Sequence, residues 1–227
     1  MIIHRATLHA AALSLLAHFY GEILALPVEI TPNTVSIRVG MSTLVYRHAS
    51  EFSDTYHVAF EIPRNLVNEA QNWLARRVPL LADQDGVTRF EPSATWNTTN
   101  LYFNDPAGNI LELIARHDRP TDQSGPFAAH HLLNISEIGL VVPNVPTAVA
   151  QLSQLYGLHP FNGQSATFTP VGDHDGMLIV VPTGRGWFPV QQPAVSAPLS
   201  IDFSQGTELR TVTFRHDDRD ATSVPVG

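Results

Sequence analysis

Residues 105–113 have the sequence DPAGNILEL, which predicts a tight turn followed by a strand. Asp, Pro, Gly and Asn all favour turn conformations. Apolar and polar side chains then alternate, as expected for a strand whose two faces have different surroundings. Leu111 and Leu113 share the face that we expect to pack against a helix, and Ile110 and Glu112 share the other. The acidic side chain therefore points away from the predicted core.

This turn and strand belong to a pattern that occurs three times along the chain. Each copy has an alternating strand, an amphipathic helix and two or three further strands. The first strands are expected at residues 3–9, 56–62 and 136–142, and the helices at 11–24, 65–77 and from Asn144 to Tyr156. The later strands are expected at 34–39 and 43–47, 100–103 and 109–116, and 166–169 and 177–181. An α+β chain with unrelated strand–helix pairs is the alternative, but similarly placed turn residues favour repeated βαβββ modules.

The rest of the chain is rich in turn-forming residues. Residues 119–133 contain Pro120, Gly125 and Pro126 and are predicted to be a linker. Residues 134–227 then hold the third βαβββ-like unit and a C-terminal tail. We expect the tail after Trp187 to wrap the surface, apart from a strand at 209–214, and residues 217–227 to be loose.

The composition excludes several classes of protein. The chain has 227 residues, of which 44% are hydrophobic, and this is enough for a substantial core. Its formal net charge of −8 disfavours a nucleic-acid partner, and no apolar stretch is long enough to span a membrane. The lack of cysteine excludes disulfides, thiolate zinc sites and cysteine nucleophiles. No signal-peptide pattern is present, so we expect a cytoplasmic protein.

The second copy carries the clearest candidate chemistry. Strand alternation places His57 and Glu61 on the face of their strand that points away from the predicted core. Glu112 lies on the corresponding face of its own strand. An imidazole and a carboxylate that converge in one cavity suit a divalent cation. A hydrogen bond between the two side chains is the alternative.

These motifs resemble the vicinal oxygen chelate superfamily, which includes glyoxalase I, fosfomycin-resistance enzymes, extradiol dioxygenases and bleomycin-binding proteins. Residues 105–113 are similar to its DPxGNxxEL signature. Phe19-Tyr20 with residues 24–27 is similar to its FYxxxLGL segment, and residues 57–60 to its HxAF strand. The resemblance covers residues 1–118 well and residues 134–190 more weakly.

The resemblance implies that paired βαβββ modules within residues 1–118 form a curled, glyoxalase-like cup of mixed sheet. Family ligands come from the first and last strands of each module, positions that His57 and Glu112 match. Mn, Ni, Fe or Zn is the implied metal, and Glu112 is also the candidate catalytic residue. Family spacing back from Phe19 places the remaining ligand at Arg5, whereas a shifted register would bring His4 inward. His4 would complete a metal site, and Arg5 would instead replace the cation, because a guanidinium donates no lone pair.

Further residues are expected in the cup or outside it. Trp96, Asn97 and Tyr102, with Arg5, are predicted to line the substrate pocket. In the third unit Glu137 is equivalent to His57, but Val180 falls at the position of Glu112. We therefore expect this unit to be structural and to pack across the two-fold axis of a homodimer.

Two functions remain open from the sequence, beside the possibility that side chains fill the cup and only an interface matters. One is a divalent-metal-dependent isomerase, lyase or dioxygenase that acts on a small oxygenated molecule. The other is a metal-free protein that binds a drug or metabolite and in which Arg5 replaces the metal.

Overall fold

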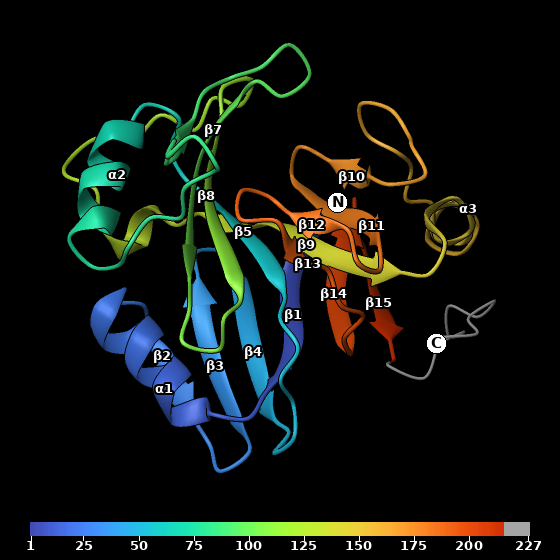
Figure 1. Ribbon diagram of the computed structural model, residues 1–227, viewed down its shortest axis with the longest axis horizontal. Coiled ribbons are helices and arrows are strands. Elements are labelled where there is room, and N and C mark those ends of the chain that lie inside the picture. The colour runs from blue at the N-terminus through green and yellow to red at the C-terminus, as the bar shows by residue number, and fades with distance from the viewer. Residues whose placement is uncertain (216–227) are drawn as a thin grey trace.

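The computed structural model describes residues 1–215, which form two large mixed sheets flanked by helices (Figure 1). Sheet A contains, in spatial order, β15 (Glu208–Phe214), β14 (Leu199–Gln205), β1 (Ile2–Ala10), β4 (Ser42–His48), β3 (Thr34–Val39) and β2 (Val28–Ile30). Sheet B contains β10 (Thr169–Asp173), β11 (Gly176–Pro182), β9 (Asn134–Val142), β5 (His57–Glu61), β8 (Ile110–Arg116), β7 (Thr98–Asn104) and β6 (Arg89–Phe90). A separate hairpin consists of β12 (Gly186–Trp187) and β13 (Gln192–Pro193).

Each module contributes one helix: α1 (Leu13–His18), α2 (Val67–Ala75) and α3 (Val145–Tyr156). The first continues as a π-helical turn over Phe19–Ile23, and a 3-10 turn at Ala129–His131 lies in the predicted linker. The third begins at the predicted cap, where the Asn144 side chain accepts a hydrogen bond from the Thr147 amide. No helix within residues 1–215 is long and apolar enough to cross a membrane.

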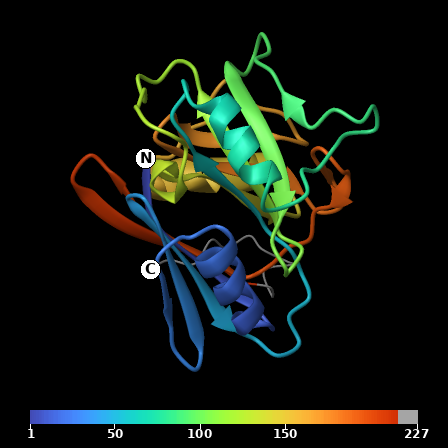
Figure 2. The same ribbon diagram turned by 90° about the vertical axis from the view of Figure 1, so that its left-hand side faces the viewer.

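One hydrophobic core contains the helix-covered faces of both sheets. It includes Ala6 and Leu8 of β1 together with Val58 and Phe60 of β5. Figure 2 shows the two sheets as layers, with α1 and α2 along the same side of the molecule. The opposite faces carry the polar residues of the alternating strands, as the period-two pattern predicts.

The α+β class and the repeated modules are confirmed. Modules one and two run from β1 to β4 and from β5 to β8, and module three from β9 to β11. The predicted strand at 166–169 is displaced, since β10 begins at Thr169. The predicted strand at 209–214 corresponds to β15, whereas residues 217–227 lie outside the described part of the chain.

The predicted pairing of modules one and two is wrong. β5 pairs antiparallel with β9, so modules two and three share sheet B, while β1 pairs antiparallel with β14. β14 lies in the segment expected to wrap the surface, yet Leu199, Ile201 and Phe203 alternate with polar residues and are buried. Because module three has its partner within the chain, the argument for a homodimer no longer holds. The oligomeric state itself stays a prediction.

Asp105, in the turn between β7 and β8, connects the two sheets. Its buried carboxylate accepts hydrogen bonds from the Tyr20 and Tyr46 hydroxyls of module one, each at 3.1 Å. It also accepts hydrogen bonds from the backbone amides of Ala107 and Asn109 at 2.9 and 3.1 Å. Burial raises the pKa of the Asp105 carboxyl, and hydrogen bonds from the side chain and amide of Asn109, from Tyr46 and from the Ala107 amide oppose the rise. The aspartate of the signature therefore has a structural role.

We predict that Asp105→Ala lowers the free energy of unfolding by about 2–4 kcal/mol, because it leaves several buried donors without an acceptor. Urea unfolding monitored by circular dichroism measures the loss. Asp83 is the matched control, since its side chain also accepts two backbone amides but no tyrosine hydroxyl. Asp83→Ala should cost less than about 1 kcal/mol. Equal losses in the two variants would contradict a role for Asp105 in joining the sheets.

Candidate metal centre

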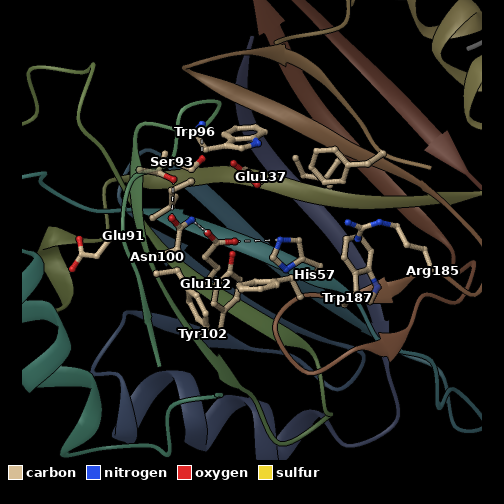
Figure 3. A pocket seen from close by; sticks show the side chains of 16 residues that line it. His57, Glu91, Ser93, Trp96, Asn100, Tyr102, Glu112, Glu137, Arg185 and Trp187 are labelled. Atoms are coloured by element: carbon tan, nitrogen blue, oxygen red, sulfur yellow. Dashed lines mark hydrogen bonds and ion pairs between the residues drawn. The ribbon is translucent and has the colours of Figure 1, made fainter. Parts of the chain in front are cut away.

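Three metal-ligating side chains meet on the open face of sheet B (Figure 3). Ala59 of β5 lies opposite Glu112 of β8 on one side and opposite Glu137 of β9 on the other. His57 precedes Ala59 by two residues and therefore shares its face. One nitrogen of His57 and one oxygen of each carboxylate lie within 4.8 Å of one another. The strand pairing thus assembles a buried His/Glu/Glu group.

The orientation of His57 leaves one ring nitrogen facing the carboxylates. Its Nδ1 lies 3.2 Å from the Ile110 carbonyl oxygen and its Nε2 lies 3.4 Å from Oε2 of Glu112. In the neutral ring, donation from Nδ1 to that carbonyl leaves the Nε2 lone pair free for a metal. Burial by itself lowers the pKa of His57, but the hydrogen bond and charge of Glu112 raise it overall.

Both carboxylates are held by neighbouring side chains. Asn100 donates a hydrogen bond to Oε1 of Glu112. Arg116 forms a buried ion pair with Glu137, and its Nε donates to the Ser136 hydroxyl at 3.1 Å. Burial raises the pKa of Glu137, and the charge of Arg116 opposes this rise. These contacts fix the carboxylates in place, as outer-shell partners do around bound metals.

The donor set fits a divalent cation. Two atoms that are each about 2.1 Å from one ion lie at most about 4.2 Å apart. The separation of 3.4 Å between His57 and Glu112 is within this limit, and the full set, at up to 4.8 Å, exceeds it by less than 1 Å. One imidazole and two carboxylates suit Mn, Fe, Ni or Zn. Within residues 1–215 this is the only group of three or more such side chains close enough to share an ion.

The metal-ligating group lies in a cavity of about 410 Å³, a size typical of small-molecule sites. Aromatic side chains make up much of its wall. They are Phe90, Trp96, Tyr102, Phe168, Trp187 and Phe188. The polar side chains of the wall include His57, Asn100, Glu112, Glu137 and Arg185, so the cavity combines apolar surface with a few polar contacts.

The structure brings four of the predicted site residues together and separates three from them. His57, Glu112, Trp96 and Tyr102 all line the cavity. Asn97 lines a neighbouring cavity instead, and its side-chain amide donates to Asp118 at 2.7 Å.

His4 and Arg5 are not in this cup, because β1 belongs to sheet A. A bulge does occur between Ile3 and Arg5, as one alternative requires. His4 nevertheless contacts Ser204 at 2.8 Å, and Arg5 lies 3.8 Å from Asp202 with 51% of its side chain exposed. The prediction that His4 completes the ligand set, or that Arg5 replaces the cation beside Glu112, is therefore wrong.

Glu137 is the member of the candidate metal-ligating group that the sequence argument did not include. Its equivalence to His57 in the repeat was the available signal, and it was discounted because Val180 is apolar. In fact Val180 belongs to the core, and Ile179 is the β11 residue that lines the cavity. Module three thus contributes a single carboxylate.

Comparison with known proteins supports the fold. No protein-family model matches the chain, and no curated protein matches it either. A candidate dioxygenase from Bacillus subtilis subsp. subtilis str. 168 has a TM-score of 0.58 at 16% identity, over 87% of this chain and 68% of that chain. A V278E variant of glyoxalase I from Zea mays has a TM-score of 0.54 at 15% identity, over 85% of this chain and 70% of that chain.

At these identities the likeness concerns the fold alone. Both structures extend over both sheets of this chain, because each covers at least 85% of it. With its repeated βαβββ modules, the chain shares the fold of this dioxygenase and of glyoxalase I.

Proposed function

We propose that this protein is a divalent-metal-dependent enzyme of the vicinal oxygen chelate type. The observation that carries the proposal is the buried group of His57, Glu112 and Glu137 at one end of an open, aromatic-walled cavity. Three protein ligands leave coordination positions for a substrate, as catalytic metal sites require. Isomerase, lyase and dioxygenase chemistry all use such a site, so the reaction type is not specified further.

His57, Glu112 and Glu137 would hold the cation. When bound, a cation of this kind supplies a Lewis acid that binds two neighbouring substrate oxygens and stabilises negative charge on them. The aromatic walls exclude water and orient the substrate. Glu112, our candidate catalytic residue, lies where a carboxylate is able to accept a proton from the substrate. Asn100 holds Oε1 of Glu112 and so fixes the position of that carboxylate.

The competing function is a metal-free binder of small molecules. This function no longer depends on Arg5. Without a metal, Arg116 pairs with Glu137, and His57 pairs with Glu112 when its ring is protonated. Metal analysis distinguishes the two functions.

We predict that the untagged protein, purified without chelator, contains close to one divalent metal per chain. His57→Ala, Glu112→Gln and Glu137→Gln should each weaken metal affinity by more than about 100-fold, because outer-shell changes alone cost about 10–100-fold. Elemental mass spectrometry after dialysis against defined metal concentrations measures the affinity.

His4→Ala and His9→Ala are matched controls, since both histidines lie on β1 in sheet A. Both control variants should retain the metal. Wild-type protein that binds none of Mn, Ni, Fe and Zn would exclude the proposed enzyme. Loss of metal from His4→Ala together with its retention in Glu137→Gln would contradict the ligand set.

Gly139 of β9 makes room for His57 beside Trp187. A Cβ atom at this position would lie 2.8 Å from Cη2 of Trp187 and 3.0 Å from Cβ of His57. The indole packs on His57, with ring centroids 5.1 Å apart. A side chain here therefore displaces the ligand or the wall of the cavity.

We predict that Gly139→Ala lowers the free energy of unfolding by about 1–3 kcal/mol through overpacking, and that it also weakens metal binding. Thermal unfolding and metal titration measure the two effects. Gly21→Ala is the control, because its Cβ would meet only Val28, at an ordinary 3.5 Å. Unchanged metal affinity in Gly139→Ala would show that His57 does not depend on this packing.

A further inference from the structure

Arg185 enters the cavity from the turn before β12. Its backbone is fixed on both sides, since its amide donates to the Pro182 carbonyl at 3.2 Å and its carbonyl accepts from the Ala194 amide at 2.8 Å. The half-buried side chain lines the same cavity as the metal-ligating group (Figure 3). The turn that carries the Arg185 guanidinium is therefore held in place by backbone hydrogen bonds.

The guanidinium of Arg185 has a wall to pack on but no acidic partner. Its Cζ lies 4.9 Å from the ring centroid of Phe168, and Nη1 donates to the Gly186 carbonyl at 3.1 Å. A guanidinium has five N–H donors, and this contact uses one of them. No carboxylate within residues 1–215 lies within ion-pair distance of Arg185.

The other charged side chains near the cavity are paired. Arg116 pairs with Glu137, and Arg89 pairs with Glu91 at 2.6 Å. Arg185 thus differs from both arginines. Burial lowers the pKa of its guanidinium, which means that the cation has lost hydration without gaining an anion.

The charges around the cavity indicate the sign of the charge on a molecule that would bind Arg185. With a divalent cation bound and His57 neutral, the two positive charges of the ion balance Glu112 and Glu137. Glu91 of the cavity wall is balanced by Arg89, so Arg185 and Arg116, which lies beside the cavity, leave a surplus of two positive charges. An anionic molecule neutralises this surplus.

We propose that Arg185 binds a carboxylate of the substrate, so that the substrate is a small, flat acid with two neighbouring oxygens at its other end. The vicinal oxygens face the metal-ligating group, and the carboxylate receives the free donors of the guanidinium. The flat shape follows from the aromatic walls. This inference rests on the proposed function, because the vicinal oxygens require a metal.

Two non-reacting probes test the proposal on protein loaded with Zn²⁺, which does not change oxidation state. 3,4-Dihydroxybenzoate has both features, and 3,4-dihydroxybenzamide has the same shape with no charge. Isothermal titration calorimetry should show that the acid binds at least about tenfold more tightly than the amide. Arg185→Gln should abolish this preference by weakening the binding of the acid much more than that of the amide, and Arg185→Lys should retain part of the preference.

Arg38→Gln is the matched control, because Arg38 is exposed on β3 in sheet A and should not affect the preference. Unchanged Zn²⁺ affinity in Arg185→Gln shows that the rest of the cavity is intact. If both probes bind equally and only with metal, the carboxylate inference fails and the proposed function survives. If both bind without metal and equally well to His57→Ala, the proposed function fails. A preference for the acid that persists in Arg185→Gln would assign the anion to another group.

Discussion

The antiparallel pairing of β5 with β9 is the contact on which the candidate site depends. It places Glu137 opposite Ala59 and hence beside His57 and Glu112. Because side chains alternate along a strand, a slip of one residue would turn Glu137 into the core and Ile138 into the cavity. The register of this pairing shifts between Ala59 and Phe60, directly beside the site.

Module one supplies the contacts that fix where β9 begins. The Met41 amide donates to the Leu133 carbonyl at 2.9 Å, and the Ser42 hydroxyl accepts from the Ile135 amide at 2.9 Å. Gly40 makes this approach feasible, since its φ is 51° and a Cβ there would lie 1.9 Å from the Leu133 oxygen. Sheet A thus positions the metal-ligating group of sheet B without contributing a ligand to it.

Sequence periodicity predicted which face each strand buries but not which strands are neighbours. Alternation placed His57 and Glu112 on one face and Leu111 and Leu113 on the other, as found. The choice of partner for β5 depends on contacts between modules, which no local pattern reports. The alternating run at Leu199–Gln205 was the detectable signal for a second pairing. Its proline- and serine-rich surroundings concealed it, and the assumed pairing of modules one and two then added His4 to the predicted site.

The charges in the cavity also differ from the net charge of the whole chain. The chain has a formal net charge of −8, so at long range it repels an anion. Screening limits that repulsion to about 8 Å at physiological ionic strength, whereas charges in a partly desolvated cavity are screened much less. Arg116 neutralises part of the acidic group, and Arg185 lines the same cavity as that group with no acidic partner in residues 1–215. If the proposed divalent cation is bound, an anion that enters would meet a local field opposite in sign to that of the surface, set by these two arginines and the metal-ligating group.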